Sequence, residues 1–175
     1  MEKLLSNSTI TLRAIEPTDL DLLYRRENDT DLWAVTNTHA PYSRQMLWQY
    51  LQSYTGDIYA SQEVRFVVTL TGTGEAVGLL ELMHFDPLNN RAELGLCIFG
   101  EYRGKGYGRQ ALRLIEGYAA RHIGLKQIYV MIQSSNADCL ALFKSEGYRE
   151  VGLLEAWVKR GNTYHDTVLL QHQLF

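Results

Sequence analysis

The residues of this sequence with the clearest chemical potential form the glycine-rich run Arg103-Gly104-Lys105-Gly106-Tyr107-Gly108, between a strand-like and a helix-like segment. Three glycines at alternate positions let the backbone turn sharply, adopt positive φ angles and bring successive N–H groups close to an anion. The following helix adds unpaired N–H groups and the positive end of its dipole. Arg103, Lys105 and Arg109 add positive charge. The pattern predicts a phosphate-binding loop, and a tight turn that binds nothing is the alternative.

Common nucleotide-binding templates do not fit this loop. After Gly104, Gly106 and Gly108 the next glycine is Gly117, so the dinucleotide fingerprint G-x-G-x-x-G is absent. The Walker pattern is absent too, because no Gly-Lys-Ser/Thr closes the loop. The pattern R-x-x-G-x-G does fit, and it resembles the acetyl-CoA loop of the GNAT N-acetyltransferase superfamily.

This resemblance extends over essentially the whole chain. Residues 91–98 and 136–148 look like the second and third conserved blocks of the superfamily, in the same order and spacing. Residues 12–20 and 161–166 are similar to the branch that holds spermidine N-acetyltransferases and ribosomal-protein N-terminal acetyltransferases. The resemblance implies an N-acetyltransferase that uses acetyl-CoA as co-substrate and requires no metal.

The length and composition predict one domain over residues 1–175. Its class is α/β (α+β), and the resemblance implies a GNAT-like, mixed and mostly antiparallel central sheet of about seven strands flanked by helices. Apolar periodicity and turn residues predict strands at 8–14, 63–71, 76–85, 91–99, 127–133, 148–158 and 164–173. They predict helices at 17–28, 44–54, 110–122 and 137–146, with Ser135 as a candidate cap of the last, and a loop at 29–43.

The donor site is implied mainly by the resemblance. In the superfamily the thioester arm of CoA pairs with backbone groups of the strand before the glycine loop, here Leu96, Cys97 and Ile98, and an N–H at or near Ile98 polarises the thioester carbonyl. Asn136 matches a position that contacts the pantetheine arm, although Asn also favours an N-cap. The implied CoA-binding set is Leu96, Cys97, Ile98, Arg103, Gly104, Lys105, Gly106, Tyr107, Gly108, Arg109, Asn136, Phe143 and Lys144.

The general acid departs from the superfamily pattern. Many relatives carry a tyrosine at the position of Phe143, where its hydroxyl protonates the departing thiolate, and phenylalanine has no proton to donate. Cys139 lies one turn earlier, where some N-terminal acetyltransferases place a serine. A small core residue is the alternative for Cys139. Tyr148 matches a core aromatic, and loss of CoA as the thiolate requires no acid.

Two carboxylates within apolar strands are candidates for the base. Glu81 and Glu93 match strand glutamates of polyamine-acetylating relatives, and each either accepts the amine proton, directly or through water, or binds a cationic acceptor. A cross-strand ion pair is the alternative for each. His84 is a weaker candidate.

Composition limits the partners. The formal net charge of −3 argues against a broad nucleic-acid surface, and the two cysteines are too few for a disulfide scaffold and lack metal-ligand spacing. Residues 1–7 lack the apolar core of a signal peptide and no segment reaches the ~20 apolar residues of a membrane span, which predicts a cytoplasmic protein without a membrane partner. A homo-oligomer is compatible with the sequence.

The leading hypothesis is acetyl transfer from acetyl-CoA to a primary amine by direct attack in a ternary complex. The acidic candidate residues favour a polyamine-like small amine as acceptor. A protein N-terminus of the ribosomal-protein type is the first alternative, which Phe143 together with Cys139 favours. A CoA-binding regulatory module with weak catalysis is the second, and Phe143 is the feature that supports it.

Overall fold

A seven-stranded sheet in the order β1-β2-β3-β4-β5-β7-β6 organises the computed structural model, which describes residues 4–36 and 38–175. The segment 1–7 was predicted not to be a signal peptide, and its first three residues lie outside the described residues. Neighbouring strands are antiparallel except β4 and β5. The mixed, mostly antiparallel sheet is therefore confirmed. The strands are β1 Ile10–Ala14, β2 Val64–Leu70, β3 Ala76–Asp86, β4 Arg91–Ile98, β5 Gln127–Gln133, β6 Arg149–Arg160 and β7 Thr163–Gln173.

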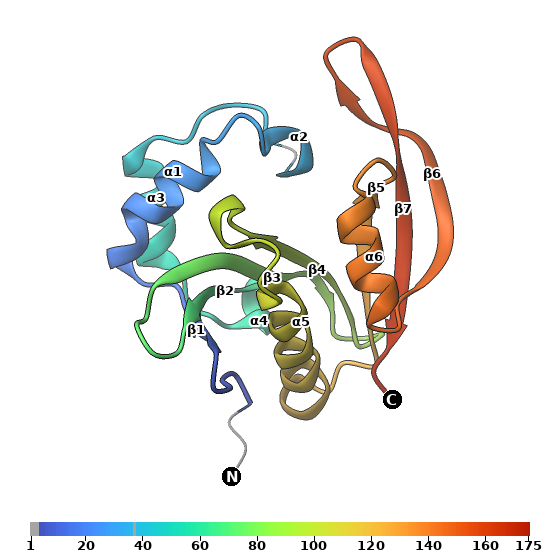
Figure 1. The fold of residues 1–175 in the computed structure, drawn as a ribbon. Coiled ribbons are helices and arrows are strands. Elements are labelled where there is room, and N and C mark those ends of the chain that lie inside the picture. Colours follow the sequence, from blue (N-terminus) through green and yellow to red (C-terminus); the bar gives the residue numbers. More distant parts are fainter. Residues whose placement is uncertain (1–3, 37) are drawn as a thin grey trace.

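Helices cover both faces of this sheet (Figure 1). They are α1 Leu20–Glu27, α2 Trp33–Thr36, α3 Arg44–Ser53, α4 Ile58–Ser61, α5 Tyr107–Tyr118 and α6 Ala137–Ser145. Short 3-10 turns span Pro17–Asp19 and Gly100–Tyr102, and a π-helical turn spans Ala119–Ile123. No helix among the described residues is long and apolar enough to cross a membrane.

Two apolar clusters hold the layers together. The larger joins α5 and α6 to one face of the sheet and includes Leu80, Leu82 and Phe143. The smaller joins α1 and α3 to the opposite face through Leu79 and Val67. Because side chains alternate along a strand, the odd-numbered residues from Leu79 to Met83 share the α1/α3 face.

The structure corrects the predicted elements at several points. The predicted loop at 29–43 contains α2, and α4 was not predicted. A helix of four residues is too short to show a 3.6-residue period; α4 is fixed locally by the Asp57 carboxylate, which accepts hydrogen bonds from the N–H groups of Tyr59 and Ala60. Asn136 rather than Ser135 caps α6.

The helix after the glycine loop begins at Tyr107, three residues earlier than predicted. Gly108 therefore lies in its first turn, where a Cβ atom would stand 3.3 Å from Leu142 Cδ2 and 3.5 Å from Ile98 Cγ1. The glycine lets α5 approach β4 and α6 closely. The positive end of the α5 dipole therefore lies directly at the glycine loop.

Candidate active site

The central feature of the site is an opening between the parallel strands β4 and β5. Among the described residues these strands pair at three positions, from Arg91 with Gln127 to Glu93 with Tyr129, although both continue beyond them. The Phe99 N–H donates to the Val77 carbonyl of β3 at 2.9 Å. Because consecutive N–H groups of a strand point to opposite edges, those of Leu96 and Ile98 face the opening.

Cys97 differs from its two neighbours. By the same alternation its backbone groups point toward β3, and its side chain lies on the α1/α3 face. Burial raises the pKa of its thiol. The structure thus favours Leu96 and Ile98, and not Cys97, as backbone partners for a ligand in the opening.

The N-terminus of α5 lies at the wide end of the opening. Gly106 is its N-cap residue with φ +80°, and the first helical hydrogen bond runs from the Gln110 N–H to the Gly106 carbonyl at 3.2 Å. The N–H groups of Tyr107, Gly108 and Arg109 therefore have no acceptor within the helix. Gly104 also has a positive φ of 75°. This loop has the backbone geometry of an anion cradle.

The basic side chains near the loop already contact protein groups. The Arg103 Nε–H donates to the Ile98 carbonyl at 3.0 Å, and Lys105 lies over the ring of Tyr102. Arg109 pairs with Glu146, which directly follows α6. Each of these cations is exposed in part or in full, so it adds positive potential around the cradle. Their contact with CoA stays a prediction.

At the start of α6 the amide of Asn136 acts as a cap, because its Oδ1 atom accepts the Cys139 N–H at 3.2 Å. Burial raises the pKa of the Cys139 thiol to about 11. A thiol with so high a pKa is a weak proton donor. Lys144, further along the helix, pairs with Glu150 at 2.8 Å. The capping alternative is therefore confirmed for Asn136, and a CoA contact of Asn136 or Lys144 stays a prediction.

Phe143 belongs to the core. Its side chain is 3% exposed and meets the ring of Tyr148 edge to face, with centroids 4.9 Å apart. The hydroxyl of Tyr148 is buried as well, and burial raises its pKa. Neither residue presents an exposed acid, and the structure gives no support to the predicted contact between Phe143 and CoA.

We therefore expect Phe143→Tyr to lower the free energy of unfolding by about 1–3 kcal/mol, because the new hydroxyl would be buried without a partner. Urea denaturation of the variant and the wild type measures this difference. Unchanged stability with faster turnover would contradict it and would support a general-acid position.

Glu81 lies on the α1/α3 face beside the opening. A Cβ atom built on Gly95 of β4 would stand 2.8 Å from Met83 Cε and 3.1 Å from Glu81 Oε1, so the side chains of Met83 and Glu81 together cover this glycine. Arg65 Nε lies 3.6 Å from Glu81 Oε2, and Arg65 also pairs with Glu27 of α1. Burial raises the pKa of Glu81, against the opposing effect of Arg65. The side chain nevertheless remains 34% exposed. A carboxylate of this kind is suited to accept a proton or to bind an ammonium group.

Glu93 occupies the last paired position before the opening. Its Oε2 atom lies 2.8 Å from Nδ1 of His84, and the glutamate is buried. The predicted alternative for Glu93 was a cross-strand ion pair, and the structure places a histidine across the strand as its hydrogen-bond partner. Glu81 likewise has its cross-strand cation, Arg65.

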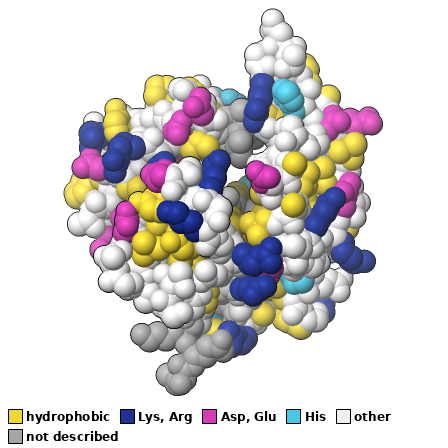
Figure 2. All heavy atoms as spheres, in the orientation of Figure 1, with side chains coloured by type: hydrophobic (Ala, Val, Ile, Leu, Met, Phe, Trp, Pro, Cys, Tyr) yellow, Lys and Arg dark blue, Asp and Glu magenta, His cyan; other side chains and the backbone are white. Residues whose placement is uncertain are grey.

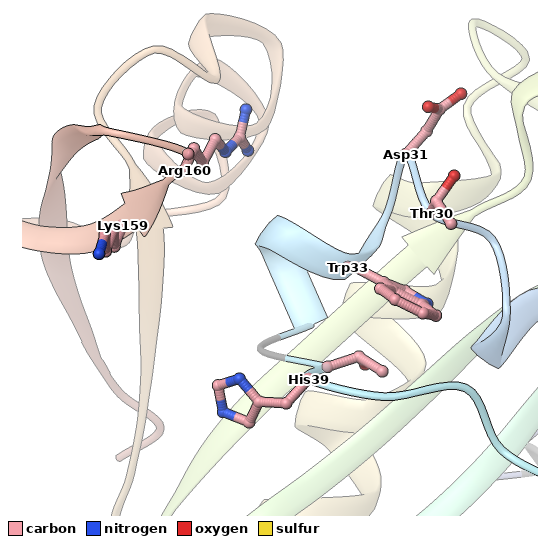
Figure 3. Close-up of a pocket in the computed structure, with 8 residues that line it drawn as sticks. Thr30, Asp31, Trp33, His39, Lys159 and Arg160 are labelled. Carbon is pink, nitrogen blue, oxygen red and sulfur yellow. The ribbon is translucent and has the colours of Figure 1, made fainter.

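A pocket of about 440 Å³ lies between the segment that contains α2 and the β6–β7 hairpin. In Figure 3 Lys159 and Arg160 extend from the β6–β7 hairpin, and Asp31, Trp33 and His39 come from the segment opposite. Figure 2 shows the molecule hollowed between this segment and the hairpin, with Lys and Arg side chains on both sides of the hollow. This pocket was not predicted, since its residues are far apart in the sequence and carry no motif.

Arg65 was also missed. A charged residue within the apolar strand Val64–Leu70 is a signal for a buried ion pair, and its partners Glu27 and Glu81 carry the opposite charge. In the described part of the chain, no group of three or more His, Cys, Asp and Glu side chains is arranged to hold a metal ion.

A sheet opened between its two parallel strands, with a glycine-capped helix at the opening, is suited to hold an extended ligand that carries a phosphate group. A family model described as acetyltransferase (GNAT) domain matches residues 9–149, and the chain belongs to this family. The resemblance seen in the sequence is thereby confirmed.

Relatives extend over nearly the whole chain. Spermidine N(1)-acetyltransferase of Escherichia coli strain K12 is 26% identical over 171 residues, which cover 96% of this chain and 89% of the relative. The putative ribosomal N-acetyltransferase YdaF of Bacillus subtilis strain 168 is 24% identical and covers 93% and 90%. The crystal structure of spermidine N-acetyltransferase from Vibrio cholerae in complex with CoA and spermine has a TM-score of 0.86 at 25% identity, covering 96% and 97%. A dodecameric structure of that enzyme has a TM-score of 0.79.

Proposed function

We propose that this protein, acting as one domain over residues 1–175, transfers the acetyl group of acetyl-CoA to a primary amine by direct attack in a ternary complex. The acceptor is a polyamine-like small amine. The observation that carries the proposal is the Glu81 carboxylate over Gly95, beside the opening between β4 and β5. This position supports the proposal, because a carboxylate there lies between the opening and the α1/α3 face.

The donor half rests on backbone groups. The cradle at Gly106 and the start of α5 suits the pyrophosphate of CoA, and the free N–H groups of Leu96 and Ile98 suit the pantetheine arm and the thioester carbonyl. The Vibrio cholerae relative with bound CoA supports the same assignment.

The acceptor half rests on charge. Glu81 and Glu93 both lie on the α1/α3 face next to the opening, and a cationic amine is attracted to such a face. Glu81 is suited to bind the ammonium group of the acceptor and then to accept its proton, which leaves a neutral amine. No step requires Phe143 or Cys139, because CoA leaves as a thiolate and takes its proton from water.

A second candidate is the amino terminus of a protein. The pocket between residues 30–39 and the β6–β7 hairpin favours it, since this pocket is roomy and bears Lys159 and Arg160, which suit a chain with acidic groups better than a polycation. The similarity to the putative ribosomal enzyme is consistent with this candidate.

The test is a steady-state screen of CoA release from acetyl-CoA with polyamines, monoamines and N-terminal peptides. We expect kcat/KM for polyamines to exceed that for peptides by about tenfold or more, equivalent to about 1.4 kcal/mol. The reverse order would favour the second candidate. CoA binding by calorimetry without turnover of any acceptor would leave a CoA-binding regulatory module and overturn the proposal.

We extend the proposal to a homo-oligomer. Strand β6 ends the sheet, so one of its edges is unpaired within the described chain, and Val151, Leu153 and Trp157 on it are each about half exposed. This edge is the surface we propose for contacts between copies.

A further inference from the structure

A bulge in β3 turns His84 toward the site. The pairing of β3 with β4 shifts register between Met83 and Asp86, and His84 adopts a left-handed φ of 50°. Without the bulge, alternation would place His84 on the α5 face with Leu82. Instead its side chain reaches Glu93 on the α1/α3 face. His84 is one of the non-glycine residues of this structure with a positive φ, and a position in a bulge accounts for it.

The pair has the arrangement of an oriented base. Glu93 Oε2 lies 2.8 Å from His84 Nδ1. Because an ionised carboxylate only accepts hydrogen bonds, an imidazole in its neutral form would donate its Nδ1–H to Glu93 and leave Nε2 as the acceptor. The His84 side chain is 69% exposed while that of Glu93 is 11% exposed. The fixed partner is thus buried and the reactive nitrogen is open.

The pair also lies close to the proposed reaction. Glu93 holds the last paired position before β4 and β5 separate. Glu81 lies on the same face and pairs with Gly95, which is two residues from Glu93 on β4, so the two carboxylates are diagonal neighbours. Tyr129 on β5, Asp86 at the end of β3 and Arg91 at the start of β4 are titratable or charged groups near the pair.

We propose that His84, held in place by Glu93, accepts the proton that the acceptor amine releases during acetyl transfer. His84 is the terminal proton acceptor in this proposal, and Glu93 is a positioning residue. The proposal rests on the function proposed above and adds to it the destination of the proton.

The amine nitrogen forms a bond to the acetyl carbon, the carbon–sulfur bond breaks, and its electron pair leaves with the sulfur of CoA. The proton of the amine passes through Glu81 or a water molecule to Nε2 of His84. The resulting imidazolium is paired with the Glu93 carboxylate and releases its proton to solvent.

Chemical rescue tests this role. His84→Gly removes the imidazole, tolerates the positive φ and leaves room for a small base. We expect kcat/KM for the amine to fall about 100-fold, with added imidazole restoring activity in a saturable way, and with an unchanged dissociation constant for CoA. Glu93→Gln should show a smaller loss without rescue, because its own imidazole still occupies the site.

Arg91→Gln is the matched control, since it removes the Arg91–Asp86 ion pair of the same turn without touching the histidine. If His84→Gly shows wild-type turnover, the proposal fails. It also fails if the variant has a lower activity and a lower melting temperature and imidazole does not restore the activity, because His84 is then structural. In that case the proposed function would still hold, provided that the wild-type protein acetylates an amine. Absence of wild-type turnover with every acceptor would instead remove the proposed function itself.

Discussion

The Gly106→Val variant is expected to bind CoA at least about 100-fold more weakly than the wild type, a difference of about 2.7 kcal/mol. Gly106 has φ +80°, which valine adopts only with strain, and relaxation of that strain turns the N–H groups at the start of α5 away from the ligand. Isothermal titration calorimetry with CoA measures the effect.

Gly74→Val is the matched control for this experiment. Gly74 has φ +74°, and like Gly106 it has no atom within 4 Å of a built Cβ, but it lies in the turn between β2 and β3. Both variants carry a similar backbone cost, about 1–3 kcal/mol. Equal CoA affinities in the two folded variants would remove the cradle assignment.

The Glu81→Gln variant should lose on the order of 100-fold in kcat/KM for the amine while its affinity for CoA stays the same. The substitution keeps the shape of the side chain over Gly95 and removes its charge and its basicity. Steady-state kinetics with varied amine and calorimetry with CoA separate the two halves of the reaction.

The stability of this variant distinguishes a catalytic from a structural role. Burial raises the pKa of Glu81 in the folded state, so its ionised form is disfavoured there. The contribution of Glu81 to stability is therefore fully present below the ordinary carboxyl pKa and is lost as the pH rises through the raised value. At pH 7 we expect the melting temperature of Glu81→Gln to match or exceed that of the wild type.

Glu63→Gln serves as a control for simple loss of charge. Glu63 directly precedes the apolar strand β2, and its carboxylate accepts a hydrogen bond from the Tyr50 hydroxyl at 3.4 Å. A lower melting temperature for Glu81→Gln together with unchanged kinetics would show that Glu81 serves as the structural partner of Arg65.

The sequence was sufficient to predict the long, periodic elements of this fold. Strand alternation and the apolar face of 107–118 are local signals, and the glycine loop sits between two of them. α4 has no such signal, because a single capping carboxylate forms it. The predicted strands and long helices therefore agree with the structure to within a few residues, and the short helices α2 and α4 were missed.

The candidate site was only partly predictable, because its geometry depends on register. The position of Glu93 follows from its strand, but its partner His84 reaches the same face through a bulge that no residue pattern announces. In the same way, the difference between Cys97 and its neighbours depends on which backbone groups β3 occupies. Burial of Phe143 likewise results from packing of α6 on the sheet.

The three residue pairs that join β4 to β5 have a mechanical consequence. They form a narrow seam between a four-stranded block, β1 to β4, and a three-stranded block, β5 to β7. A ligand that spans the opening braces the two blocks against each other, because it supplies hydrogen bonds that the missing ladder does not. Occupancy of the opening is thereby linked to the rigidity of the whole sheet.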